Sequence, residues 1–176
     1  MAFGASFSEL QRMRARFGEV TRHQFQDHQD VRKTIIRSSL DGLDRPIVVL
    51  GDSLIEMADF PKALCGKPVV SGGIGGATTS DFLRVGPEIL ASSKPAAVVV
   101  ALGANDGNDP LQKQRTSDLL REIGKLSPVV ITMSTKREEF NRSDLGKDGV
   151  HLTRSASAAF VSRITAPVER GLGGCD

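Results

Sequence analysis

Three residues suited to nucleophilic catalysis occur in this sequence: Ser53 and, far along the chain from it, Asp148 and His151. A serine hydroxyl attacks a carbonyl carbon efficiently only when a neighbouring base removes its proton. His151 is the candidate base, because it is the only histidine outside the polar N-terminal stretch. Asp148, three residues earlier, could bind the other ring nitrogen, fix the tautomer and stabilise the imidazolium. These residue types predict acyl transfer through Ser53.

Such chemistry also needs donors for the negative charge that develops on the substrate oxygen. Gly76 lies in the glycine-rich stretch 72–76, where a backbone N–H can approach a substrate with no side chain in the way. Asn105 follows another apolar run and carries a neutral amide donor. Donors of this kind each lower the barrier by ~2.7–4 kcal/mol in serine hydrolases. Gly76 and Asn105 are therefore the candidate oxyanion donors.

Each of these short blocks also has an ordinary structural explanation when taken alone. A serine after a strand is typical of a helix N-cap, and Asp148 with His151 could be a local ion pair. The glycines of 72–76 suggest a phosphate loop, but "ATT" follows them rather than the Lys-Ser/Thr of a nucleotide-binding loop. The blocks are more informative together, because they supply complementary parts of one catalytic site.

Short apolar runs rich in β-branched residues predict the elements that bring these blocks together. They are continuous rather than alternating, as expected for parallel strands covered on both faces, and they span 47–50, 68–70, 96–102 and 128–133. Three of the runs end in the polar blocks. Ligands of such sheets bind at the carboxyl ends of the strands, so the candidate residues are expected at one edge. The sequence predicts a three-layer α/β/α sandwich.

The connections between the runs read as helices. We expect a helix over 78–92, one opened by Asp109 and Pro110, and a last one capped by Thr153, whereas 54–67 leaves room only for a short helix. The chain of 176 residues is predicted to be a single domain. Within it we expect an N-terminal helical extension (1–42), a catalytic core (43–172) and a flexible tail (173–176).

The N-terminal extension holds the two other histidines. Apolar residues recur at near-helical spacing there and predict one or two helices. His23 and His28 lie among Gln, Arg and Asp, which favours a solvated helix face over a metal site because no third ligand is near. We expect neither a metal nor another cofactor.

Four ordered blocks resemble the signature of the SGNH, or GDSL-type, hydrolases: "GDSL" at 51–54, "GGIGGATT" at 72–79, "GAND" at 103–106 and "DGVH" at 148–151. The resemblance implies a flavodoxin-like parallel sheet of four or five strands and esterase or lipase chemistry without a metal. It assigns Ser53 as nucleophile and, through its N–H, as an oxyanion donor beside Gly76 and Asn105. Asp148 and His151 complete the implied triad.

One feature departs from that family pattern. Asp148 follows Asn105 by only 43 positions, and the polar stretch 134–147 offers no apolar run for the strand that family members usually place there. A fifth strand is thus expected to be absent or vestigial, which would leave an open site suited to a large or polar substrate.

Composition excludes several other functions. The 23 basic and 21 acidic residues nearly cancel, so a nucleic acid is not an expected partner, and no apolar run approaches the roughly 20 residues of a membrane span. Cys65 and Cys175 are predicted to be unlinked thiols. The chain start lacks a secretory pattern, which indicates the cytoplasm, or the periplasm or a membrane anchor if a leader has been removed.

The function predicted from sequence is hydrolysis of carboxylic esters, with short acyl groups such as acetyl favoured by the scarcity of aromatics and the absence of an apolar lid segment. A small molecule or a carbohydrate would carry the ester. Lysophospholipase, thioesterase and O-acyltransferase activities on the same site stay open, as does a catalytically silent binding module of the same fold. The sequence leaves the oligomeric state open.

Overall fold

The computed structural model describes the backbone of residues 2–175 and the side chains of residues 8–175. Its centre is a sheet with the order β2-β3-β1-β4-β5, in which β1, β3, β4 and β5 are parallel and β2 is antiparallel to β3. The strands span Ile47–Gly51 (β1), Ala63–Leu64 (β2), Lys67–Gly73 (β3), Ala97–Leu102 (β4) and Val130–Ser134 (β5). All four predicted runs are therefore parallel strands.

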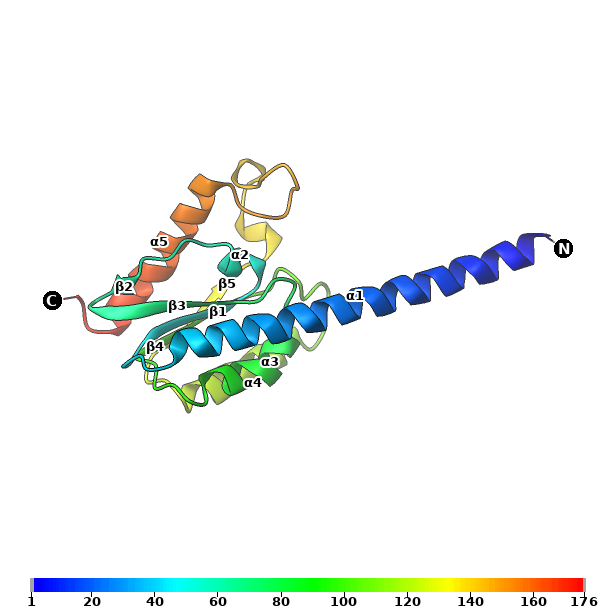
Figure 1. The fold of residues 1–176 in the computed structure, drawn as a ribbon. Helices are drawn as coiled ribbons and strands as arrows, with labels where there is room; N and C mark the ends of the chain where they lie inside the picture. Colours follow the sequence, from blue (N-terminus) through cyan, green and yellow to red (C-terminus); the bar gives the residue numbers. More distant parts are fainter. Residues whose placement is uncertain (1, 176) are drawn as a thin grey trace.

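Helices cover both faces of this sheet (Figure 1). They span Ala2–Leu40 (α1), Ser53–Glu56 (α2), Thr79–Leu90 (α3), Gln112–Gly124 (α4) and Arg154–Gly171 (α5). Val48 and Leu50 point to the face covered by α1, α3 and α4, whereas Ile47 and Val49 point to the face of α2 and α5. This division, with a buried core on each side of the sheet, confirms the predicted three-layer sandwich.

The N-terminal extension is one helix rather than two. The second half of α1 lies along the body of the molecule, which is formed by the sheet and α2–α5. There Ile36 and Leu40 are buried in the same core as α3. Its first half projects away from the body as a free rod (Figure 1). The helix ends where Gly42 takes a φ of 71°, a conformation that glycine adopts without strain.

Two details of the connections depart from the sequence prediction. Asp109 and Pro110 do not open α4 but form a turn ahead of it, where the Asp109 carboxylate accepts a hydrogen bond from the N–H of Leu111 at 2.9 Å and pairs with Arg115. The two-residue strand β2 lies outside the predicted runs, because two residues show no periodicity, and it is not the fifth strand that family members place after residue 133. Thr153 caps α5 as predicted, with the N–H of Ala156 donating to its hydroxyl.

The stretch between β5 and α5 contains no strand, as expected from its polar sequence. Two short 3₁₀ turns occupy it instead, at Arg137–Glu139 and Arg142–Asp144, followed by an isolated bridge between Leu145 and Leu152. This segment carries Asp148 and His151 over the carboxyl edge of the sheet.

The prediction of unlinked thiols is wrong. Cys65 and Cys175 form a disulfide with their Cα atoms 4.5 Å apart. Cys65 and Gly66 both have positive φ angles, 50° and 68°, in the tight hairpin turn between β2 and β3. The C-terminal tail returns to this turn after α5, and a pattern of residue types could not have indicated such a long-range approach. Among the helices of the described part of the chain, none has the combination of length and apolar composition that a membrane span requires.

Candidate active site

A sharp turn from β1 into α2 places Ser53 at the edge of the sheet. A Cβ atom at Gly51 would lie 2.3 Å from the Ile55 side chain and 2.5 Å from the carbonyl oxygen of Ala101, so only glycine permits this turn. Asp52 is the N-cap of α2, and its carboxylate accepts the N–H of Leu54 at 3.0 Å. Capping is therefore the task of Asp52, which leaves the Ser53 side chain available.

Ser53, His151 and Asp148 form one hydrogen-bonded chain. The Oγ atom of Ser53 lies 3.2 Å from Nε2 of His151, and Nδ1 of His151 lies 2.8 Å from Oδ2 of Asp148. The structure thus brings together residues that are 98 positions apart in the sequence. A base within hydrogen-bond reach of a hydroxyl, itself oriented by a carboxylate, is the geometry needed to activate a serine.

The turn around Asp148 keeps this carboxylate ionised. The N–H of Val150 donates to Oδ1 at 3.0 Å, and the N–H of His151 donates to the same oxygen at 3.1 Å. The bond from Val150, followed by those from the ring and the N–H of His151, lowers the pKa of Asp148 to about 2. An ionised Asp148 favours the tautomer of His151 that carries its proton on Nδ1 and leaves Nε2 free to accept one.

Two backbone N–H groups stand unused near Ser53. Gly76 has a φ of +78°, and within the described residues its N–H has no hydrogen-bond acceptor. The N–H of Ser53, at the first position of α2, has no acceptor within its helix. The neighbouring Gly75 approaches Ser53 closely, since a Cβ atom built on it would lie 3.8 Å from the Cβ of Ser53. These donors fit the predicted use of Ser53 and Gly76 toward a substrate oxygen.

Asn105 lies in the turn after β4, on the same edge of the sheet. Its side-chain amide donates to the carbonyl oxygen of Ala77 at 3.0 Å, which ties it to the loop that holds Gly76. An amide has a second N–H, and the exposed position of Asn105 leaves that proton open to a ligand. The loops after β3 and β4 are therefore joined at the two candidate oxyanion donors.

The loop between β3 and α3, which holds Gly76 and is called the oxyanion loop below, is supported by a network that the sequence did not predict. The carboxylate of Glu56, in α2, accepts the N–H of Gly75 at 2.5 Å and also binds Nε2 of His28 at 3.1 Å. Arg32 pairs with Glu56 at 3.2 Å and donates to the carbonyl oxygen of Gly73 at 3.0 Å. His28 therefore lies partly exposed on the helix, as predicted, but it also has a contact with Glu56 that the sequence did not predict. His23 does lie on the exposed face, near Asp27.

Two buried carboxylates, also not predicted, tie the strand ends together. The hydroxyl of Thr135, directly after β5, donates to Asp52 at 2.5 Å and accepts the N–H of Ala104 at 3.1 Å. Burial raises the pKa of Asp52, although the hydrogen bonds from Thr135 and Leu54 oppose the shift. Asp106 joins the turn after β4 to the start of α3, because its carboxylate accepts the N–H and the hydroxyl of Thr79 at 2.8 and 2.7 Å.

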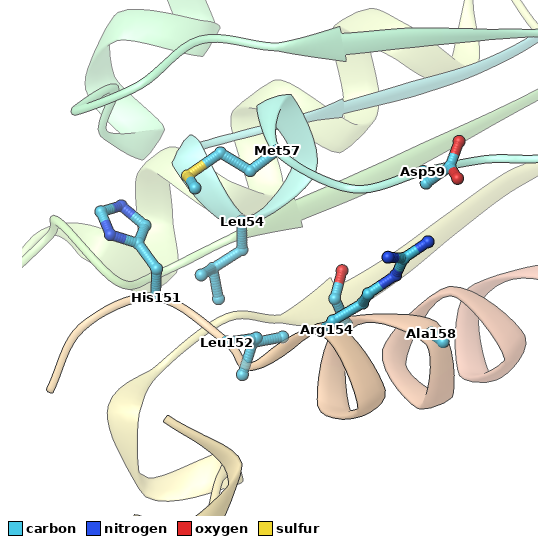
Figure 2. Close-up of a pocket in the computed structure, with 8 residues that line it drawn as sticks. Leu54, Met57, Asp59, His151, Leu152, Arg154 and Ala158 are labelled. Carbon is cyan, nitrogen blue, oxygen red and sulfur yellow. The ribbon is translucent and has the colours of Figure 1, made fainter. Parts of the chain in front are cut away.

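A cavity of about 600 Å³ adjoins His151 between α2 and the start of α5 (Figure 2). Leu54 and Leu152 supply apolar surface, and Asp59 and Arg154 supply opposite charges. Figure 2 shows Arg154 directed toward the side of the cavity on which Asp59 lies. The described residues hold no group of three or more His, Cys, Asp or Glu side chains that could bind a metal ion.

A mostly parallel α/β sheet with a hydrogen-bonded serine, histidine and aspartate at the carboxyl edge is an arrangement typical of serine hydrolases. The sequence agrees with that class, because a model of GDSL-like lipases and acylhydrolases matches residues 1–127. The chain belongs to the GDSL-like lipase/acylhydrolase family. No protein of curated function matches the sequence significantly.

Solved structures share the fold at low sequence identity. A Streptococcus pneumonia protein described as a platelet activating factor is 16% identical with a TM-score of 0.64, covering 88% of this chain and 98% of its own. A psychrotrophic esterase from Pseudoalteromonas sp. is 15% identical with a TM-score of 0.57, covering 74% of this chain and 100% of its own. A Clostridium thermocellum family 3 carbohydrate esterase is 18% identical with a TM-score of 0.53, covering 74% and 100%.

Proposed function

We propose that the chain is a serine esterase that hydrolyses carboxylic esters through an acyl-enzyme on Ser53. The hydrogen-bonded chain from Ser53 through His151 to Asp148 carries this proposal, since it has the distances that general-base activation of a hydroxyl requires. The family supports a hydrolase, and the unused N–H groups of Ser53 and Gly76 support a site for a developing oxyanion.

In the first half of the proposed reaction, Oγ of Ser53 attacks the ester carbonyl carbon while Nε2 of His151 takes the hydroxyl proton. The carbonyl electron pair moves to oxygen, and the oxyanion is stabilised by the N–H groups of Ser53 and Gly76 and by the amide of Asn105. Asp148 stays ionised and stabilises the imidazolium. The tetrahedral intermediate then collapses, and His151 gives its proton to the departing alcohol oxygen.

In the second half, water replaces the alcohol. His151 removes a proton from this water as its oxygen attacks the acyl carbon, and the same donors stabilise the second oxyanion. When that intermediate collapses, the bond to Oγ of Ser53 breaks and His151 returns the proton to the hydroxyl. The products are a carboxylic acid and free enzyme, so no oxidant, reductant or metal is needed.

We further propose a short acyl group, such as acetyl, on a polar alcohol. The cavity beside His151 carries the charges of Asp59 and Arg154, and these favour a hydroxyl-rich ligand over a long alkyl chain. Carbohydrate esterases occur among the proteins that share the fold, including one active on acetylated mannans. A carbohydrate is therefore a reasonable first choice for the alcohol part.

A fluorophosphonate and a series of p-nitrophenyl esters from acetate to palmitate test this function. We expect covalent labelling of Ser53, loss of labelling and turnover in Ser53→Ala, and the highest kcat/KM at acetate. Ester hydrolysis that survives Ser53→Ala undiminished would overturn the assignment of the nucleophile. A folded protein that turns over no ester and takes no label would instead indicate a silent binding module.

A further inference from the structure

The projecting half of α1 carries an apolar stripe that nothing in the described structure covers. Leu10, Met13, Phe17 and Val20 are 47%, 52%, 69% and 54% exposed. Their spacing alternates between three and four residues, as in the seam of a coiled coil, where apolar side chains recur every 3.5 residues on average. Large apolar side chains grouped on one exposed face commonly mark an interaction surface.

The stripe continues down the helix, on a different side from the one that contacts the body. At about 100° per residue, Val31 and Ile35, which are also exposed, fall within the same arc as the four residues above. Ile36 and Leu40, which are buried against the body, lie about 120° and about 160° from the middle of the stripe around the helix axis. Over residues 10–24, which are exposed, a second helix could therefore pack on the stripe without displacing the body from α1.

The projecting half has little to hold it as a helix by itself. Tertiary packing of one apolar face supplies most of the stability of helices in proteins. The side chains of residues 8–24 are exposed, and contact with the body begins only near Phe25, whose ring faces Gly76. A partner helix on the stripe would supply the packing that the body does not.

We propose that this partner is α1 of a second copy of the chain, and that the two helices form a parallel two-stranded coiled coil over residues 10–24. With Leu10 and Phe17 at the first core position of each heptad, Glu9 and Arg14 flank the seam at positions that face each other between parallel helices. Neither is in an ion pair within the described residues, so both are free to pair across the seam.

The charges disfavour the opposite orientation. Antiparallel helices centred on the stripe would bring Arg14 against the partner's Arg14, and Arg16 against the partner's Arg16, with like charges at both flanks.

The apolar core positions of the coil end after Val20. The next core position holds the polar Gln24, and the one after it holds Asp27, whose two copies would repel each other in a parallel pair. The parallel coil is thus expected to end near residue 24, close to where each helix begins to contact its own body.

This pairing would set two active sites side by side without covering either one. His28 and Arg32, the residues of α1 that support the oxyanion loop, lie beyond residue 24, where the coil is expected to end, so the partner helix need not displace them. The two bodies would lie at the same end of the coiled coil, each with its own Ser53 and His151. The assembly would therefore present a pair of sites to a substrate that carries several ester groups.

Light scattering of the full chain over a range of concentrations tests the pairing. We expect twice the mass of one chain, and for Phe17→Glu a dissociation constant raised at least about 100-fold, because the seam would then bury unpaired carboxylates. Ala15→Glu is the matched control, since it adds the same charge on the opposite side of the same helix and should leave the dimer intact. A wild-type chain that stays monomeric at every concentration overturns the proposal.

Two further variants test the orientation. Glu9→Arg should weaken the dimer, and Glu9→Arg combined with Arg14→Glu should restore it, since the pair across the seam is then rebuilt with its charges exchanged. Leu10→Cys should cross-link on oxidation, because the two copies of position 10 meet only in the parallel arrangement. A dimer that fails both tests is not a parallel coil, and a monomer that sediments with anionic phosphatidylserine vesicles would show a membrane-binding helix instead.

Circular dichroism of each variant separates loss of pairing from loss of folding. Phe17 contacts no core residue of the body, so Phe17→Glu should retain the helix and strand signal of α2–α5 and the sheet. If the variant retains the body but the dimer is unchanged, the stripe is not the interface and the proposal fails.

Discussion

The carboxylate of Glu56 accepts a hydrogen bond from the N–H of Gly75, the residue directly before the candidate oxyanion donor Gly76. His28 and Arg32 hold that carboxylate from the side of α1. The helix that precedes the core therefore takes part in shaping the site, because it fixes the acceptor on which the oxyanion loop rests. Glu56 is a positioning residue in this account, since it lies behind the loop.

Glu56→Ala should lower kcat on a short p-nitrophenyl ester by about 10- to 100-fold, because small displacements of a catalytic group have effects of this size. KM should change little, since the loop acts on the transition state. Glu56→Gln should fall between the wild type and Glu56→Ala, because its amide oxygen can still accept the N–H of Gly75. Steady-state kinetics of the three proteins check this order.

Glu88→Ala is the matched control for that experiment. Glu88 also joins the body to α1 through ion pairs, at 3.3 Å with Lys33 and 3.9 Å with Arg37, but it does not contact the oxyanion loop. Its kcat should equal that of the wild type. An equal loss in Glu56→Ala and Glu88→Ala would mean that docking of α1 matters and the bond to Gly75 does not.

Asp148→Asn should reduce kcat by up to about 10⁴-fold while the fold is retained, because an amide can favour the wrong tautomer of the His151 imidazole, the proposed base. The pKa of Asp148, at about 2, lies well below the pH range of an ester assay. Protonation of Asp148 is therefore not expected to limit the wild-type enzyme above about pH 4. A pH profile of kcat/KM checks this. If the fall of kcat/KM in acid is the same in the wild type and in Asp148→Asn, protonation of Asp148 does not cause it.

The same carboxylate should make stability depend on pH in acid. Its pKa is lowered in the folded state from 3.8 to about 2, so its stabilising effect is complete above pH 3.8 and is lost as the pH falls toward 2. Urea unfolding of the wild type and of Asp148→Asn at a series of pH values measures this. The difference between the two midpoints should shrink through that window, and a difference that is constant or grows on acidification would contradict the prediction.

The sheet could be predicted because each buried parallel strand leaves a continuous apolar run in the sequence. The same rule placed Ser53 and Asn105 at one edge, since each lies directly after a run. Asp148 and His151 lie on a loop with no such pattern, and they were predicted from residue type, because His151 is the only histidine outside the N-terminal stretch and Asp148 stands three residues before it. The structure then sets His151 beside Ser53.

The residues that support the site show no such pattern in the sequence. Glu56 and His28 are 28 positions apart and meet only because α1 crosses the oxyanion loop, so each looked like an ordinary polar residue. Asp52 and Thr135 are 83 positions apart and meet because their strands end at one edge. A rule that links acidic residues at neighbouring strand ends to buried hydrogen bonds could have found Asp52. No local rule would have paired Glu56 with α1.

The disulfide between Cys65 and Cys175 should contribute to the stability of the fold. It closes a loop of 110 positions, and a cross-link of this span restricts the unfolded chain enough to stabilise a protein by about 2–4 kcal/mol. Cys65→Ser should lose that amount in urea unfolding, and reduction of the wild type should have the same effect. Thiol titration of the denatured, unreduced protein should find no free thiol.

Cys175→Ser is the control that separates the bond from the packing of either side chain. Because both substitutions remove the same bond, each should cost an equal amount, and the double variant should cost no more than one of them. If the losses of unfolding free energy in the two single variants add in the double variant, the side chains act through independent packing and not through a cross-link. Ester hydrolysis should be unchanged in all three variants, since the hairpin turn that holds Cys65 lies at the opposite end of β3 from Gly76.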